Sequence, residues 1–175
     1  MKMMGIIIKI SVVKGDITTA KVDVIVNAAN KQLQAGGGVC GAIFRASGHI
    51  KELQEECNIH APLKTREACL TDGYDLPCKY ICHAVGPIYV DDKTSEPLLE
   101  STYKSALYYT DVNGFKSIAF PLISAGIYGY PLDKAIDVAI KTINNYNYKN
   151  VEQVYIYCIN DEICKAVEKT IKIYE

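Results

Sequence analysis

Several features are scarce or missing in this chain of 175 residues, and each absence narrows the possible functions. The chain has no tryptophan, only three phenylalanines, and no apolar run long enough for a transmembrane helix. It has no basic excess, because 19 Lys and Arg stand against 20 Asp and Glu, for a formal charge of −1. Proteins that bind duplex DNA or bulk RNA through phosphates usually show such an excess. We therefore expect no nucleic-acid partner.

The chain also lacks internal repeats, low-complexity tracts and any segment with the composition of a linker. Its length suits one domain, and an apolar share of 49% argues against disorder, so we expect a single domain over residues 1–175. The apolar segment 1–13 is interrupted by Lys9 and has no cleavage site after it, which favours a first strand over a signal peptide. Seven scattered cysteines, an odd number, favour reduced buried thiols and a cytoplasmic protein.

Strand-like and helix-like stretches alternate along the chain between Gly, Pro and Asp or Asn clusters. The pattern predicts strands over residues 5–13, 22–28, 67–71, 79–85, 117–123 and 151–158. Apolar spacing predicts helices over 39–57, from Pro97 onward, over 132–143 and over 162–174. This alternation predicts an α/β fold whose largely parallel sheet has helices on both faces. Ligands of such sheets bind at the carboxyl ends of the strands.

Two strand ends combine small residues with the start of a helix, which favours anion binding. The first runs through Asn30 into Gly36-Gly37-Gly38-Val39. The glycines let the main chain approach a ligand, and the helix start offers free N–H groups and a positive dipole end. A flexible loop is the alternative interpretation of a glycine triplet alone. The segment matches neither G-x-G-x-x-G nor G-x-x-x-x-G-K-[ST], which disfavours the usual dinucleotide and nucleotide-hydrolysing sites.

The second strand end is Ser124 to Pro131, again between an apolar strand and a helix. Two such loops facing each other suit a pyrophosphate better than a single phosphate, and main-chain N–H groups would bind it because neither glycine segment holds Lys or Arg. A smaller signal is Asp16 after the first strand, whose carboxylate can accept a hydrogen bond from an exocyclic amine such as that of adenine. The alternative for Asp16 is a turn or helix cap.

Four segments together resemble the macrodomain family in its MacroD-type branch. They are GDITTAKVDVIVNAAN (15–30), GGGVCGAIFRASG (36–48), LPCKYICHAVGP (76–87) and FPLISAGIYGYP (120–131). The match keeps its order and spacing over essentially the whole chain. The resemblance implies a three-layer α/β/α sandwich with a mixed, largely parallel central sheet and a cleft for ADP-ribose. It also implies hydrolysis of mono-ADP-ribose from acidic side chains, or deacetylation of O-acetyl-ADP-ribose.

The resemblance also assigns roles by position. It implies that Asp16 takes the adenine amine, that the Ile17 backbone takes the ring edge, and that Asn30 bonds the distal ribose near the bond that breaks. One loop would hold the distal phosphate and ribose, the opposite loop would hold the pyrophosphate, and a residue after the last strand would line the adenine. These further ligand-binding positions are Gly37, Gly38, Val39 and Cys40, then Ser124, Ala125, Gly126, Ile127 and Tyr128, and finally Asn160.

Cys40 departs from the family pattern, which usually has Asp at this position to orient or deprotonate the attacking water. A neutral thiol is a poor acceptor, so the substitution predicts weaker general-base help. Some viral macrodomains resemble this chain in having Gly-Val-Cys and are still counted as hydrolases, so Asn30 and Cys40 remain the expected catalytic pair. We do not expect Cys40 to be a covalent nucleophile, because no His lies near it in the sequence.

Zinc is the metal to consider, because one macrodomain branch binds it. Cys57 with His60, or Cys78 and Cys82 with His83, have a spacing that zinc ligands can have. However, Cys82 and His83 are neighbours in a predicted strand and therefore point to opposite faces. The zinc branch also carries a Cys- and His-bearing insertion after NAAN that this chain lacks. We expect no metal and no other cofactor.

Two functions of different classes remain open. The first is an enzyme that hydrolyses the ester between the distal ribose of ADP-ribose and an acyl group, through orientation and electrostatics. The second is a reader that binds ADP-ribose or ADP-ribosylated proteins without turnover. Cys40 in place of the usual Asp is the feature that favours the reader. The expected partners are ADP-ribose, ADP-ribosylated proteins or O-acetyl-ADP-ribose. We expect a monomer without a membrane partner.

Overall fold

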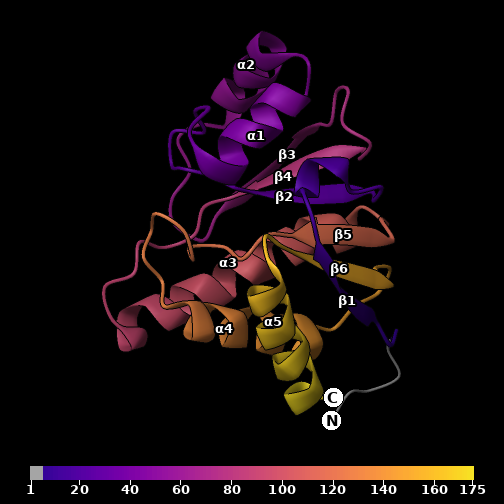
Figure 1. Cartoon of the computed structure of the whole chain (residues 1–175). Coiled ribbons are helices and arrows are strands. Elements are labelled where there is room, and N and C mark those ends of the chain that lie inside the picture. The colour runs from indigo at the N-terminus through magenta and orange to yellow at the C-terminus, as the bar shows by residue number, and fades with distance from the viewer. Residues whose placement is uncertain (1–5) are drawn as a thin grey trace.

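A six-stranded sheet forms the centre of the molecule (Figure 1). The computed structural model describes residues 6–175. In sheet order the strands are β1 (Lys9–Lys14), β6 (Gln153–Cys158), β5 (Ser117–Phe120), β2 (Val24–Ala28), β4 (Tyr80–Ala84) and β3 (Ala68–Asp72). Every neighbouring pair is parallel except β3 with β4, which is antiparallel. The prediction of a mixed, largely parallel sheet is confirmed.

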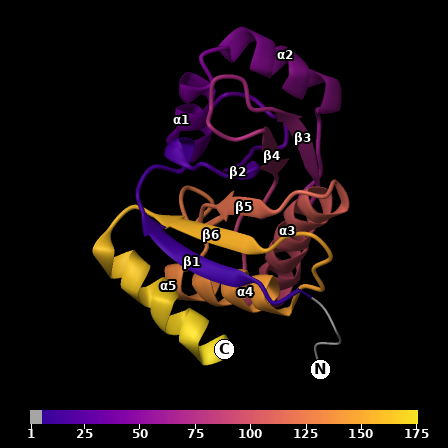
Figure 2. The same cartoon turned by 90° about the vertical axis from the view of Figure 1, so that its right-hand side faces the viewer.

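Helices cover both faces of this sheet, which makes the three layers visible in Figures 1 and 2. One face carries the short 3-10 helix η1 (Ile17–Thr19), α1 (Gly38–Ala46) and α2 (Ile50–His60). The other face carries α3 (Asp92–Val112), α4 (Leu132–Asn145) and α5 (Asp161–Tyr174). None of the helices in the described range 6–175 is both long and apolar enough to cross a bilayer.

Alternation of side chains along the strands divides the core into two halves. On β2, Ile25 packs with Phe44 of α1 and Leu53 of α2. Its neighbours Val24 and Val26 point the other way and pack on the side of α3, α4 and α5. All three strand residues are buried, so β2 has an apolar side chain on each face. Each such burial stabilises the fold by about 1.5–3 kcal/mol, which fixes β2 and the loop after it.

The expected continuous helix over 39–57 is wrong, because two helices occupy this range. Gly48 lies between them with φ +68°, a conformation that glycine adopts without strain and that commonly ends helices. A side chain at this position would also collide with Asp75. The apolar spacing continues across the break, which is why the periodicity alone did not reveal it.

The expected start of a helix at Pro97 is also wrong. Helix α3 begins at Asp92, where the Asp91 side chain accepts a hydrogen bond from the Thr94 N–H, and Pro97 lies inside the helix. Strand β5 ends before the expected residue 123, since Pro121 has no N–H with which to continue the ladder. The first strand begins at Lys9, and the predicted Gly5 lies outside the described residues.

Candidate functional site

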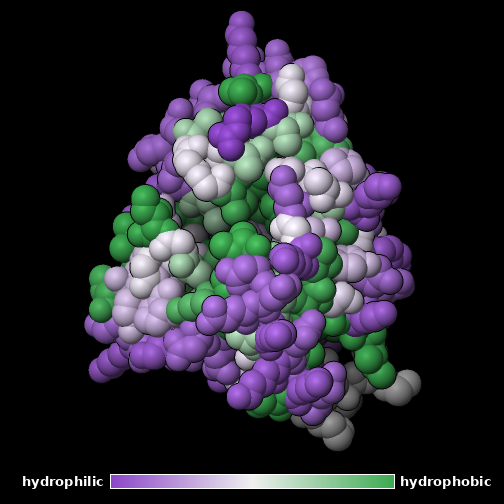
Figure 3. Space-filling model, viewed as in Figure 1, coloured by the Kyte–Doolittle hydropathy of each residue, from purple (hydrophilic) through white to green (hydrophobic). Residues whose placement is uncertain are grey.

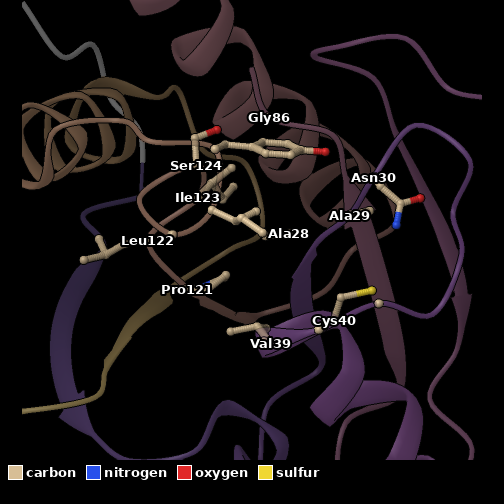
Figure 4. A pocket seen from close by; sticks show the side chains of 16 residues that line it. Ala28, Ala29, Asn30, Val39, Cys40, Gly86, Pro121, Leu122, Ile123 and Ser124 are labelled. Atoms are coloured by element: carbon tan, nitrogen blue, oxygen red, sulfur yellow. The ribbon is translucent and has the colours of Figure 1, made fainter. Parts of the chain in front are cut away.

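A cavity of about 310 Å³ opens beyond the carboxyl ends of β2 and β5. Figure 3 shows the hollow on the molecular surface, and Figure 4 shows it from close by. Two loops form its walls, one after β2 and one after β5. The lining residues are Ala28, Ala29, Asn30, Gly36, Gly37, Gly38, Val39, Cys40, Gly86, Pro121, Leu122, Ile123, Ser124, Gly126, Ile127 and Tyr128. None of these carries a charge, so any anion held here is held by dipoles.

Asn30, on the first wall, is fixed by its own loop. Its Nδ2 donates to the Gln34 carbonyl at 2.9 Å, and its Oδ1 accepts from the Gln34 N–H at 3.0 Å. Gln54 of α2 holds the same loop, because it donates to the Leu33 carbonyl at 2.8 Å and accepts from the Ala35 N–H at 3.0 Å. The amide of Asn30 therefore has a fixed direction while keeping a second N–H and a second lone pair for a ligand.

The glycine segment that follows presents main chain to the cavity. A Cβ added at Gly37 or Gly38 meets no other atom within 4 Å, so both positions face open space. Helix α1 starts at Gly38, and its N-cap Gly37 has no side chain that could cap the first turn. The first N–H groups of α1 thus have no partner within the helix and carry the positive end of its dipole. This end of the wall suits a phosphate.

The second wall turns at Ser124, which has the left-handed φ of +67°. Its hydroxyl donates to the Pro87 carbonyl at 2.7 Å, and its own carbonyl accepts from the Tyr130 N–H at 2.9 Å. Between these anchors, the N–H groups of Gly126, Ile127 and Tyr128 donate to no other group within residues 6–175. The loop therefore offers consecutive unpaired donors, which is the second half of a site for two linked phosphates.

Nine of the thirteen predicted ligand-binding residues line this cavity. They are Asn30, Gly37, Gly38, Val39, Cys40, Ser124, Gly126, Ile127 and Tyr128. Of the others, Ala125 packs against the core. The remaining three, Asp16, Ile17 and Asn160, lie at the ends of β1 and β6, outside the cavity.

Asp16 and Asn160 each cap a helix in this structure. Asp16 Oδ1 accepts from the Thr18 N–H at 2.9 Å, and Asn160 Oδ1 accepts from the Ile163 N–H at 2.9 Å. The two strand ends are adjacent, because the Gly15 N–H donates to the Cys158 carbonyl at 3.1 Å. Asp16 and Asn160 therefore belong to one edge of the molecule, even though they come from opposite ends of the sequence.

Sequence reasoning missed several lining residues, of which Gly86 is the most telling. A Cβ at Gly86 would collide with Ser124 and Ile123, so the strand β4 exit must be glycine for the second wall to close against it. The Gly86-Pro87 pair was visible in the sequence as the end of a strand, but only the contact with Ser124 gives it a place in the site. Ala28, Ala29, Gly36 and Pro121 to Ile123 flank predicted residues.

Cys40 lies on the cavity side of α1, 7% exposed, and close to Asn30 in Figure 4. His83, distant in the sequence, is linked to Cys40 through Asn27. Asn27 Nδ2 is 3.6 Å from the Cys40 sulfur and 3.0 Å from Nδ1 of the fully buried His83. Burial is the main cause that lowers the pKa of His83 to about 3, with His60 adding to it. His83 is therefore neutral at neutral pH and does not contact the thiol directly.

The opposite orientation of Cys82 and His83 is confirmed. Cys82 packs on the side of α3 and α4, whereas His83 contacts Asn27, Cys57 and Thr71 on the side of α1 and α2. Within residues 6–175 no group of three His, Cys, Asp or Glu side chains has the arrangement of a metal site. All seven cysteines are free and buried.

Comparison with known proteins gives the same family by several routes. The family model "Macro domain" matches residues 26–139. An O-acetyl-ADP-ribose deacetylase from Cronobacter sakazakii is 41% identical over 165 residues, which cover 88% of either chain. The ADP-ribose glycohydrolase MACROD2 from Xenopus laevis is 45% identical over 159 residues, covering 89% of this chain and 38% of that protein.

Solved structures agree with the sequence comparison. The Oceanobacillus iheyensis macrodomain with ADP superposes with a TM-score of 0.86 at 37% identity, covering 93% of this chain and 89% of the other. A variant of the same macrodomain has been solved with ADPR and superposes equally well.

Proposed function

The chain belongs to the macrodomain family, in its MacroD-type branch, and we propose that it binds ADP-ribose and hydrolyses the ester between the distal ribose and an acyl group. The acyl group is acetate or an Asp or Glu side chain of a modified protein. The relative from Cronobacter sakazakii carries the name of a deacetylase, and the one from Xenopus laevis that of an ADP-ribose glycohydrolase. Both names fit cleavage next to the distal ribose.

One observation carries the binding half of the proposal. Neither wall of the cavity has a charged side chain. Both walls direct unpaired N–H groups at the cavity, one set from the start of α1 and the other from Gly126 to Tyr128. A pyrophosphate has acceptor oxygens on two linked phosphorus atoms, so it can use both sets of donors at once. A single phosphate would leave one set without a partner.

Asn30 and Cys40 carry the catalytic half. Asn30, held by Gln34, orients the ribose so that the bond to be broken faces a water held against the phosphate. The water oxygen bonds to the electrophilic carbon of the ester, the ester C–O bond breaks, and ADP-ribose and a carboxylate leave. One proton of the water ends on the ribose hydroxyl, and the other goes to solvent. Main-chain N–H groups stabilise the charge that develops, while Cys40 lies where the family usually has Asp.

The adenine end of the ligand extends past the cavity toward the ends of β1 and β6. Asp16 keeps one carboxylate oxygen beyond the one that caps η1, and this oxygen can accept from the adenine amine. The Ile17 main chain follows directly, and Asn160 lies at the adjacent strand end. Their adjacency supports assigning all three to the adenine.

The test is the release of free ADP-ribose from a protein that carries it on Glu or Asp, followed over time with enzyme well below substrate. We expect many turnovers per molecule. O-acetyl-ADP-ribose, assayed in parallel through release of acetate, separates a preference for small acyl groups from one for proteins.

A reader without catalytic activity is the second candidate, and Cys40 is the observation that favours it. A neutral thiol gives the attacking water a weaker acceptor than a carboxylate does. If modified protein is retained on the domain but no ADP-ribose is released, the reader is correct and the hydrolase is not.

A further inference from the structure

A chain of buried polar groups runs beneath the floor of the cavity and ends at Cys40. Asn27 of β2 is 1% exposed, and its Nδ2 lies 3.0 Å from His83 Nδ1 and 3.6 Å from Cys40 Sγ. On its far side, His83 Nε2 lies 2.8 Å from Thr71 Oγ1. Burying polar groups in an apolar core costs stability unless all of them are hydrogen-bonded. A functional role would explain why these buried polar groups are present.

The direction of the hydrogen bonds follows from the Asn27 amide nitrogen, which can only donate. Because Nδ2 lies 3.0 Å from His83 Nδ1, Nδ1 is the acceptor. A neutral imidazole that accepts at Nδ1 carries its proton on Nε2. Nε2 then donates to Thr71 Oγ1 at 2.8 Å, with the Cys57 sulfur 3.7 Å away.

The Asn27 amide thus serves two partners with its donor end. One hydrogen of Nδ2 goes to His83 and the other is directed at the sulfur of Cys40. Asn27 Oδ1 is the buried side-chain atom without a hydrogen-bond partner among residues 6–175.

We propose that Asn27 is a positioning residue of the site, which directs an N–H from beneath the floor at the side chain of residue 40 and keeps that side chain an acceptor. The inference rests on the proposed function and deepens it. Such a donor suits a thiolate, and equally the carboxylate that is usual in the family. Thr71 and His83 act through Asn27, since neither lines the cavity.

These hydrogen-bonded groups are also linked to Asn30, through the Gln34 carbonyl. The Cys40 thiol donates to the Gln34 carbonyl at 3.5 Å, and Asn30 Nδ2 donates to the same oxygen at 2.9 Å. Residue 40 is thus held from two directions, by Asn27 from below and by the Gln34 carbonyl from the loop. Displacing Asn27 is expected to disturb the sulfur first and Asn30 second.

The experiment replaces the donor without changing its shape, in Asn27→Asp. The readouts are the rate at which iodoacetamide alkylates Cys40 at one fixed pH, located by peptide mass spectrometry, and kcat and KM for release of ADP-ribose. We expect alkylation of Cys40 to fall about tenfold, because the thiolate loses an N–H donor and faces a carboxylate oxygen. We expect kcat to fall while KM stays within about twofold of wild type.

Thr71→Val with Thr110→Val is the matched pair. Both threonines are buried, and both changes replace a hydroxyl by a methyl group. Thr110, however, donates to the Ala106 carbonyl in α3 and takes no part in the hydrogen bonds that link Thr71, His83 and Asn27. Thr71→Val frees the imidazole proton to move to Nδ1 and lets the Asn27 amide turn over. We expect about threefold slower alkylation of Cys40 in Thr71→Val and the wild-type rate in Thr110→Val.

Equal alkylation rates in wild type and Asn27→Asp would overturn the assignment. If Asn27→Asp does not fold, equal rates in Thr71→Val and Thr110→Val overturn it instead. Alkylation needs no turnover, so a wild-type protein that releases no ADP-ribose refutes the hydrolase while the alkylation rates still decide the role of Asn27.

Discussion

The two walls of the cleft differ in what holds them. In the first wall side chains make the anchoring bonds, since Asn30 pairs with the Gln34 main chain and Gln54 reaches in from α2. In the second wall the bonds are mostly between main-chain groups, as from Tyr130 N–H to the Ser124 carbonyl and from Tyr89 N–H to the Tyr128 carbonyl.

The difference assigns separate tasks to the walls. A wall fixed by side chains can place one particular amide, which the reaction needs at Asn30. A wall fixed by its main chain can leave several N–H groups unpaired and carry side chains that matter little, such as Ile127 at 99% exposure. Substitutions in the first wall should therefore change turnover, and backbone-altering substitutions in the second should change affinity.

The largest effect is expected from Gly126→Glu in the second wall. A Cβ here meets nothing within 4 Å, so the new side chain enters the open space of the cleft and brings a negative charge to the phosphate donors. Placing a carboxylate next to the phosphates costs about several kcal/mol of binding free energy, so ADP-ribose affinity should fall by about 100-fold or more in calorimetry. The neutral Gly126→Gln separates charge from bulk and should lose less. Measurable binding by Gly126→Glu near the wild-type affinity would contradict the cleft assignment.

Asn30→Ala in the first wall should have the next largest effect, on turnover. Loss of one group oriented toward the reacting bond typically lowers kcat by about 100-fold, whereas the affinity for ADP-ribose should change only a few-fold. Gln34→Ala is the control, because Asn30 bonds the main chain of residue 34, which this change retains. Equal losses of kcat and affinity would mean that Asn30 supports the loop and takes no part in the reaction.

Cys40→Asp should raise turnover, by about tenfold, and leave ADP-ribose binding nearly unchanged. A carboxylate is a better acceptor for the water than a thiol, and Asn27 already directs an N–H at this position. Initial rates and calorimetry on both proteins measure the two quantities. An unchanged rate would show that water activation at residue 40 does not limit the reaction.

The smallest effect is expected from Gln54→Ala, which removes the link between α2 and the first wall. The loop loses two hydrogen bonds that pre-organise it, so affinity should fall about threefold while the melting temperature changes little. Glu55→Ala, an exposed change on the same helix, is the matched control and should bind as wild type does. If the two variants bind equally well, the side-chain anchoring of the first wall is unimportant for binding.

The sequence predicts the fold well because its signals are local. The continuous apolar run of β2 and the apolar stripe of α4 follow from burial, on both faces of the strand and on one face of the helix, and both elements appear where expected. The break at Gly48 could not be predicted, because the apolar spacing continues across it. The start of α3 at Asp92 was missed because Pro97 suggested a later beginning.

For the site, the sequence identifies both walls but not what lies behind them. Glycines at strand ends predict the two loops. Gly86 belongs to the site only because it packs against Ser124, which is distant in the sequence. The link from Cys40 through Asn27 to His83 joins three elements and leaves no mark on local spacing. Such contacts between distant residues require the folded chain.

The most direct test of the central claim is a time course of ADP-ribose release from a Glu- or Asp-linked mono-ADP-ribosylated protein. Enzyme is kept well below substrate so that turnovers can be counted. The account predicts many turnovers per molecule, lost in Asn30→Ala and raised in Cys40→Asp. No release by the wild-type protein, with the modified substrate retained on it, would contradict the account and identify a reader.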